Sequence, residues 1–234
     1  MCERAKGRQP LKIAITGGIG SGKSYVCARL RRFGIDIYDC DAAAKRLMRT
    51  SASLQQALRE AVGSDVYQDG VLNKARMAQF LLASEHNAQI IDRLVHPAVA
   101  ADFVASGQTW MECAILFESG FDRLVDVVVC VDAPREVRMQ RVMARDGITA
   151  AKAEEWMQRQ WPSDEVRRRS DYVILNDGKA DIDAQIHQLL EITPEKPEKP
   201  EKPDNPENPE SPESPESPEK PDNPENPESP VNNP

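Results

Sequence analysis

The residue types and spacing between Gly17 and Ser24 are those of a loop that binds phosphate groups. Gly17 is followed by four residues and then by Gly22, Lys23 and Ser24, which matches the pattern G-x-x-x-x-G-K-[S/T]. Such a loop turns backbone N–H groups inward around phosphate oxygens, and glycine reaches the positive φ angles that this shape needs. In this pattern the lysine reaches the β- and γ-phosphates of a nucleotide, and the hydroxyl binds Mg²⁺. We therefore expect the nucleotide to contact Gly18, Ile19, Gly20, Ser21, Gly22, Lys23, Ser24 and Tyr25.

The residues on either side of the loop indicate the strand and the helix that must position it. The apolar run Ile13–Ile15 is typical of a buried strand, and Val26, Cys27, Leu30 and Phe33 follow at helical spacing. A helix that begins at the loop points its partially positive N-terminus at the phosphates. The order strand, loop, helix is the context that the motif requires, so a chance glycine-rich turn is the less favoured alternative.

A second pair of candidate residues, Asp39 and Asp41, lies where the next predicted strand ends. Ligands of a doubly wound sheet bind beyond the carboxyl ends of its strands. A carboxylate at that edge can accept the proton of a substrate hydroxyl or orient metal-bound water. The alternative is that an aspartate caps the following helix, and one of the two can cap while the other catalyses.

The remaining sequence alternates predicted strands and helices, which is typical of an α/β domain with a parallel sheet covered by helices. We expect five strands, at Lys12–Thr16, Ile35–Tyr38, Thr109–Leu116, Val125–Val131 and Tyr172–Leu175. We expect helices at Lys23–Phe33, Ala42–Met48, Leu54–Val62, Lys74–Leu82, Pro97–Ala105, Arg135–Arg145, Ala150–Trp161 and Ile182–Leu190. The block 51–106 is almost wholly helical and too long for a simple crossover, so it is expected to form a helical insertion over the site.

The composition divides the chain near residue 193. Residues 194–234 hold 14 of the 18 prolines, and their 12 acidic residues and 4 lysines account for the whole formal net charge of −8. A segment with so little apolar surface cannot offset its ordering entropy, so we expect a disordered tail after one α/β domain, 1–193. The proline at every third position is compatible with a polyproline II spacer or docking segment, or with a tail that has no specific partner.

Charge, hydropathy and cysteine usage argue against several classes of protein. Residues 1–193 carry equal numbers of acidic and basic side chains, so no basic field favours nucleic acid as a partner. The sequence contains no apolar run of membrane-spanning length and no apolar signal core near Met1. The five cysteines are odd in number and lack C-x-x-C spacing, which favours a reducing compartment, the cytoplasm, over a disulfide framework or a zinc site.

An ordered series of short motifs resembles the dephospho-CoA kinase family. After GGIGSGKS and the D-x-D of residues 39–41, the series continues with Leu94–Pro97, Ile115–Glu118, Arg145–Gly147 with Thr149, Asp171–Ile174 and Asn176–Gly178. The phosphate loop alone is generic, but the order of the other motifs makes the resemblance specific over roughly residues 11–190. It implies a three-layer P-loop kinase fold, with the insertion at about 51–106 and a lid at about 141–169.

The resemblance also implies a reaction. ATP, with Mg²⁺, would donate its γ-phosphoryl group to the 3′-hydroxyl of the ribose of dephospho-CoA. Asp41 would be the general base, Lys23 would neutralise the phosphates, and Ser24 would bind the metal. Arg141 and Arg145 lie four residues apart on one predicted helix and resemble lid arginines that cover the transferring group. The alternative for these arginines is a solvated basic stripe beside Arg138.

Further positions match the family in less distinctive sequence. Asn176 and Gly178 resemble a loop that meets the adenine of ATP, although N-D-G is also an ordinary turn sequence. His96 resembles a substrate-side residue or, because a proline follows, a histidine at the entry of a helix. Glu118 resembles another substrate-side residue or a helix cap. Gln160 resembles a glutamine at the base of the lid.

The chain departs from the family pattern at four positions. Glu112 stands where members often have aspartate, and Ala114 where they have proline. Trp156 stands in place of an arginine and Val166 in place of a lysine. The first change lengthens a carboxylate arm that would orient Mg²⁺ through water, and the last two concern the lid.

Two other functions stay open as alternatives. Another small-molecule P-loop kinase, for a nucleoside monophosphate or shikimate, would differ in its acceptor site within residues 51–106. A nucleotide-binding switch would hydrolyse nucleotide without an acceptor, although the guanine-specific motif N-K-x-D is absent from the sequence. The expected partner is the small-molecule acceptor, and the expected state is a monomer or a weak oligomer.

Overall fold

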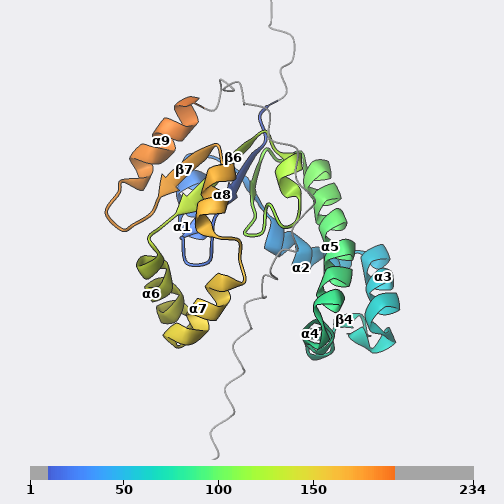
Figure 1. Cartoon of the computed structure of the whole chain (residues 1–234). Helices are drawn as coiled ribbons and strands as arrows, with labels where there is room; N and C mark the ends of the chain where they lie inside the picture. The colour runs from blue at the N-terminus through green and yellow to red at the C-terminus, as the bar shows by residue number, and fades with distance from the viewer. Residues whose placement is uncertain (1–9, 193–234) are drawn as a thin grey trace, which may run out of the picture.

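Five parallel strands form the central sheet of the computed structural model, which describes residues 10–192 (Figure 1). The strand order is β2-β5-β1-β6-β7. The bounds are β1 Ile13–Thr16, β2 Ile37–Asp39, β5 Trp110–Glu112, β6 Val127–Asp132 and β7 Tyr172–Leu175. The expected α/β class with a five-stranded parallel sheet is confirmed. The tail expected at 194–234 lies outside the described residues.

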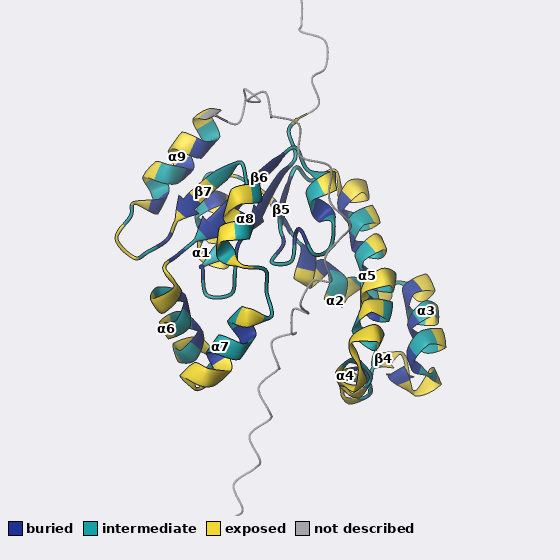
Figure 2. Cartoon of the chain, in the orientation of Figure 1, coloured by how far each residue is buried: buried dark blue, intermediate teal, exposed yellow. Residues whose placement is uncertain are grey.

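Helices cover both faces of this sheet, which makes the domain three layers thick. Ile13 and Ile15 of β1 belong to a core cluster with residues of the first and last helices, whereas Ala14 belongs to a second cluster with Phe103 of the insertion. Figure 2 shows the buried strands between helices that are exposed on their outer sides. The helices are α1 Lys23–Arg32, α2 Cys40–Thr50, α3 Ala52–Val62, α4 Lys74–Ala83, α5 Glu85–Ser106, α6 Arg135–Asp146, α7 Ala150–Gln158, α8 Ser163–Arg169 and α9 Ile182–Ile192.

The third strand of the sequence is shorter than expected. The predicted range is Thr109–Leu116, but β5 ends at Glu112 and residues 114–120 form turns. Its neighbours end at the same level, because β1 gives way to the phosphate loop and β2 to α2. A strand without ladder partners loses its hydrogen bonds, so the chain turns there.

The insertion is mostly helical, as expected, but it also contains a small hairpin. Strands β3 Tyr67–Gln68 and β4 Val71–Leu72 pair antiparallel between α3 and α4. The two-residue turn is Asp69-Gly70, and both residues have positive φ. D-G is a strong signal for such a turn, so this hairpin was visible in the sequence.

Helix α5 is the main difference from the sequence expectation. The prediction began a helix at Pro97, whereas one continuous helix runs from Glu85 to Ser106 with that proline inside it. Its buried residues recur every fourth position, at Ile91, Val95, Val99 and Phe103. This packing outweighs the helix hydrogen bond that proline removes. No helix among residues 10–192, α5 included, is long and apolar enough to cross a membrane.

The lid region consists of three helices rather than the two that were expected. The helix predicted at Ala150–Trp161 ends at Gln158, and the unpredicted α8 begins at Ser163 after Pro162. Proline cannot continue α7, since it has no N–H, but it is favourable at a helix start. In Figure 1, α6 and α7 extend below the sheet on one side, and α4 and α5 on the other.

Candidate active site

The loop that connects β1 to α1 has the conformation expected of a phosphate loop. Gly17, Gly20 and Gly22 have φ angles of 143°, 78° and 91°. The Lys23 Nζ donates a hydrogen bond to the Gly17 carbonyl oxygen at 2.7 Å, which closes the loop on itself. Lys23 is the first residue of α1, so the N–H groups of the first helical turn lie at the loop. The site therefore combines an ammonium with the positive end of a helix.

Charged groups from three elements converge on Lys23. Burial lowers the pKa of its ammonium below the ordinary value, and the nearby carboxylates of Glu112 and Asp41 act in the opposite direction. The Arg138 guanidinium adds to the lowering. Glu112 ends β5 and Asp41 lies in the first turn of α2, so the carboxyl ends of adjacent strands bring these groups together.

A hydroxyl and a carboxylate meet beside this lysine. The Ser24 Oγ donates a hydrogen bond to Glu112 Oε1 at 3.1 Å. Hydroxyl and carboxylate oxygens are the ligands that Mg²⁺ prefers, and this ion commonly takes only one or two of them from the protein. Among residues 10–192 no cluster of three or more His, Cys, Asp and Glu side chains is arranged for a metal. The pair fits a metal that is also held by phosphates, rather than a self-sufficient metal site.

The two aspartates that follow β2 have different roles in the structure. Asp39 is the N-cap of α2, and its Oδ1 accepts a hydrogen bond from the Ala42 N–H at 2.9 Å. Asp41 is exposed and lies near Lys23. Asp39 is therefore the residue that caps the helix, and Asp41 remains the candidate base.

Ser21 and Asn176 shape the inner side of the loop. Ser21 is 1% exposed, and its Oγ has no hydrogen-bond partner among the described residues. A buried hydroxyl without a partner is costly, and a phosphate oxygen would supply one. The Asn176 Nδ2 donates to the Ser21 carbonyl oxygen at 2.8 Å, and a Cβ at Gly22 would collide with this amide. Asn176 thus supports the loop, and its expected contact with adenine stays a prediction.

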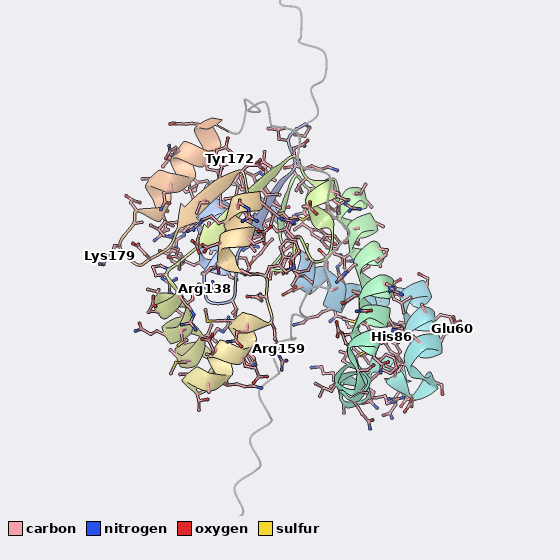
Figure 3. The ribbon with its side chains drawn as sticks, viewed as in Figure 1. Glu60, His86, Arg138, Arg159, Tyr172 and Lys179 are labelled. Atoms are coloured by element: carbon pink, nitrogen blue, oxygen red, sulfur yellow. The ribbon has the colours of Figure 1, made fainter. Side chains whose placement is uncertain are left out.

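Ile19 is held through both of its backbone polar groups. Its N–H donates to Gln160 Oε1 at 2.6 Å, and its carbonyl oxygen accepts from Arg138 Nε at 2.9 Å. Arg138, labelled in Figure 3, is 5% exposed and also donates to Ser163 Oγ. A Cβ at Gly18 would collide with its guanidinium. The lid region therefore contacts the phosphate loop at its second and third residues.

The two predicted lid arginines occupy different places. The Arg141 Nη1 lies 3.4 Å from the carbonyl oxygens of Gly20 and Ser21, so this guanidinium reaches the phosphate loop. Arg145 is exposed and pairs with the adjacent Asp146, with Nη2 2.7 Å from Oδ2. The structure brings Arg141 to the loop, whereas the proposed contact of Arg145 with a transferring phosphoryl group stays a prediction.

The two substrate-side candidates lie next to the turns that follow β5. His96 is in the middle of α5, so the alternative of a helix-entry position is wrong, and the substrate-side role stays a prediction. Burial lowers its pKa, and its ring meets Phe121 edge-to-face with centroids 5.8 Å apart. Burial raises the pKa of Glu118, although backbone N–H groups that donate to it, including that of Trp161, act in the opposite direction.

Two candidate nucleotide contacts lie on exposed parts of the site. Tyr25 is 48% exposed, and its hydroxyl accepts a hydrogen bond from Arg29 Nη2 at 2.7 Å. Gly178 is exposed with a φ of 88°, in the loop between β7 and α9. Both residues lie in segments that border the loop, but the roles expected of them stay predictions.

Comparison with known proteins decides the family. The family model described as dephospho-CoA kinase matches residues 11–181. The chain belongs to the dephospho-CoA kinase family. Dephospho-CoA kinase from Bacteroides fragilis is 35% identical over 197 residues, which cover 80% of this chain and 94% of the relative. Dephospho-CoA kinase from Porphyromonas gingivalis is 43% identical over 146 residues, covering 60% and 72%.

A solved structure has a similar fold. The crystal structure of TT1252 from Thermus thermophilus has 30% sequence identity and a TM-score of 0.66. The match covers 79% of this chain and 98% of that one. The three-layer P-loop kinase fold expected from the motifs is confirmed.

The departures from the dephospho-CoA kinase pattern now have structural explanations. Trp156 is 4% exposed and packs with Val142 and Ala153, so apolar packing holds α6 against α7. Val166 is buried in the main core cluster. Ala114 lies in the turns after β5 and not in the strand. Glu112 retains a contact with Ser24 despite its longer side chain.

Arg138 is the residue of the site that the sequence did not identify. It was considered only as part of a solvated stripe, which is wrong, because this side chain is buried against the phosphate loop. A signal was available, since Arg138 and Arg141 lie three residues apart and share one helix face. The sequence could not show that this face turns toward the loop.

Proposed function

We propose that this chain transfers the γ-phosphoryl group of ATP to the ribose 3′-hydroxyl of dephospho-CoA, giving coenzyme A and ADP in the last step of coenzyme A biosynthesis. The observation that carries this proposal is the convergence of Lys23, Asp41 and Glu112 at the carboxyl ends of β1, β2 and β5, in a member of the dephospho-CoA kinase family. The phosphate loop supplies the donor side, and Asp41 faces the acceptor side.

Each part of the loop has a task in holding ATP. The residues proposed to contact it are 18–25, with Arg141 over the loop and Asn176 and Gly178 toward the adenine. Lys23 supplies a positive charge to the β- and γ-phosphates, where charge develops as the phosphoryl group moves. The Ser21 hydroxyl, which has no hydrogen-bond partner among residues 10–192, supports this assignment, because it is buried in a position that a phosphate oxygen can satisfy. Arg145 is proposed to reach the transferring group from α6 when the lid closes.

Asp41 is proposed as the general base. Its carboxylate accepts the proton of the ribose 3′-hydroxyl while that oxygen forms a bond to the γ-phosphorus, and the bond from this phosphorus to the bridging oxygen of ADP breaks. Exposure of Asp41 at the start of α2 supports the assignment, because the acceptor must approach it from solvent. His96 and Glu118 are proposed to bind the acceptor.

The residues present also fit a magnesium ion. Ser24 Oγ and the Glu112 carboxylate would hold it, directly or through water, beside the loop. When bound, the ion neutralises charge on the β- and γ-phosphate oxygens. The protein's own contribution is to orient this hydroxyl and this carboxylate toward the same place.

We also propose how the chain is divided and where it works. The kinase domain occupies about 1–193, the insertion at about 51–106 forms the acceptor side, and 141–169 is the lid. A reducing compartment, the cytoplasm, is supported by Cys27, Cys40, Cys113 and Cys130, which are buried and form no disulfide within residues 10–192.

The experiment that tests the proposal measures ADP release from ATP and Mg²⁺ with and without dephospho-CoA. We expect strong stimulation by dephospho-CoA in the wild type and its loss in Asp41→Asn, with ATP binding intact. Asp39→Asn is the matched control, because asparagine also caps a helix and should keep the activity. If dephospho-CoA does not stimulate ADP release by the wild type, the protein is either a kinase for another acceptor or a nucleotide-binding switch. A screen with nucleoside monophosphates and shikimate as acceptors distinguishes these two possibilities.

A further inference from the structure

The segment that leads from α7 into α8, Gln160 to Ser163, contacts both sides of the active site through Gln160, Trp161 and Ser163. It is a short connection that begins after Arg159, which is labelled in Figure 3, and ends at the first residue of α8. We call residues 160–163 the bridge. Its contacts with the donor side and with the acceptor side come from neighbouring residues.

The donor-side contacts of the bridge are made to one residue of the phosphate loop. Gln160 Oε1 accepts from the Ile19 N–H at 2.6 Å, and Ser163 Oγ accepts from Arg138, which also holds the Ile19 carbonyl oxygen. The backbone of Ile19 is therefore held at its N–H and at its carbonyl oxygen. One partner belongs to the bridge and the other contacts the bridge. A shift of the bridge must move this part of the loop or break these hydrogen bonds.

The acceptor-side contacts are made by the next residue, Trp161. Its ring stacks on Phe117, with centroids 5.8 Å apart and planes at 10°, and the Arg169 guanidinium lies 4.6 Å from the ring centroid. Its backbone N–H donates to the Glu118 carboxylate. Phe117 and Glu118 belong to the turns after β5, beside the proposed acceptor site. Stacked aromatic and cation–π contacts of this kind fix a side chain's position.

We propose that Gln160 and Trp161 are positioning residues that couple occupancy of the ATP site to occupancy of the acceptor site. The inference rests on the proposed function for the identity of the acceptor. Because the two residues are adjacent, and Pro162 restricts the backbone after them, a displacement at Glu118 reaches Ile19 through the peptide that joins them and the side chain of Gln160. Binding of either ligand should then stabilise the bridge position to which the other ligand binds more tightly. By thermodynamic linkage, each ligand raises the affinity of the other by the same factor.

The test measures binding of the β,γ-imido analogue of ATP with Mg²⁺ by calorimetry, with and without saturating dephospho-CoA. In the wild type we expect the acceptor to tighten the analogue by about fivefold or more. In Gln160→Ala and in Trp161→Ala this ratio should fall to within about twofold of one, while binding of each ligand alone changes less than about threefold. A purely structural defect would weaken both ligands without removing the ratio.

Matched controls separate coupling from general damage. Gln158→Ala removes an exposed glutamine whose side chain contacts only Glu154 in the described contacts, so it should keep the wild-type ratio. Trp161→Phe keeps a ring to stack on Phe117 and should rescue most of the coupling. The Gln160 variant tests the proposal even if loss of the indole prevents folding.

The outcomes distinguish this inference from the proposed function. The role of the bridge would be overturned, and the proposed function kept, by a wild type that phosphorylates dephospho-CoA but shows no coupling between the two ligands. Coupling that persists in both the Gln160 and the Trp161 variants would have the same meaning. A wild type that does not phosphorylate dephospho-CoA would overturn the proposed function instead.

Discussion

The ammonium of Lys23 is partly buried between a helix N-terminus, the loop carbonyl of Gly17 and the carboxylates of Glu112 and Asp41. Burial dominates and lowers its pKa. Phosphates placed beside it would raise that pKa again, because they favour the charged form. The binding of ATP is therefore linked to the protonation of one side chain.

This linkage predicts the pH dependence of ATP affinity. Above the lowered pKa of the free protein the lysine is neutral, so binding must take up a proton, and affinity should fall by up to about tenfold per pH unit. Calorimetry from neutral pH up to the ordinary lysine pKa of about 10.4, in buffers of different ionisation enthalpy, measures the proton uptake. Lys23→Arg should show no uptake in this range, since arginine stays charged. Equal proton uptake in wild type and variant would contradict the account.

The division of labour between Asp39 and Asp41 predicts two distinct phenotypes. Asp39→Ala removes the cap of α2 and should lower the free energy of unfolding by about 1 kcal/mol. Asp41→Asn should leave stability within about 0.5 kcal/mol and lower kcat by about 10²- to 10⁴-fold. Denaturant titration and steady-state kinetics on both variants measure the two quantities. A reversed pattern would show that the capping residue is the base.

The residues of the donor side were largely predictable from the sequence, because the motif fixes both identity and spacing. Lys23, Ser24 and the loop glycines follow from the pattern alone. Arg138 was not predictable, because its role depends on how α6 is rotated against the loop. The Ser24 contact with Glu112 joins positions 88 residues apart, and only the sheet register places them together.

At the scale of elements, helix α5 of the insertion is fastened to β2 and α2 through one carboxylate. Asp102 Oδ2 accepts hydrogen bonds from Tyr38 Oη at 2.7 Å and from Arg46 Nη2 at 2.6 Å. Tyr38 directly precedes the Asp39–Asp41 segment, so this contact helps to position the candidate base. The two hydrogen bonds, that of Arg46 first, lower the pKa of Asp102 below its ordinary value.

This anchor predicts a pH-dependent contribution to stability. Asp102→Ala should lower the free energy of unfolding by about 1 to 3 kcal/mol at pH 7. Because the folded-state pKa is below the unfolded one, the contribution of the charge is complete above the ordinary aspartate value near 4 and is lost as pH falls through the folded-state pKa. Urea titrations of wild type and Asp102→Asn between pH 7 and 2.5 should converge at the acid end. A difference that is constant with pH would contradict the assignment.

The elements that the sequence missed share a physical cause. The first half of α5 was missed, and Pro97 lies inside the helix and not at its start. Both features depend on a stripe of core contacts, which outweighs the tendency of proline to break a helix. Pro162, which is visible in the sequence, separates α7 from α8, but the predicted helix ended at Trp161 and no helix was expected after it. Strand β5 ends early because its partners end, which a single sequence does not reveal.

In the molecule as a whole, two helical regions extend beyond the carboxyl ends of the strands. The candidate active site lies at these strand ends. One region holds α3 to α5 and is the proposed acceptor side, and the other holds α6 to α8 and is the proposed lid (Figure 1). The proline-rich segment 194–234 lies outside the described residues, and its composition leaves it too little apolar surface to offset the entropy of ordering. Deletion of 194–234 should therefore leave kinase activity within about twofold. Steady-state assays of the full chain and of residues 1–193 measure this, and a large loss would show that the tail takes part in catalysis.

The proposed reaction transfers a phosphoryl group to one particular hydroxyl of the acceptor. The most direct measurement identifies the product of ATP, Mg²⁺ and dephospho-CoA by mass spectrometry and ³¹P NMR, with ADP counted in parallel. We predict one new phosphomonoester, on the ribose 3′-oxygen, for each ADP released. ADP without a phosphorylated acceptor, or a phosphate on another hydroxyl, would contradict the account.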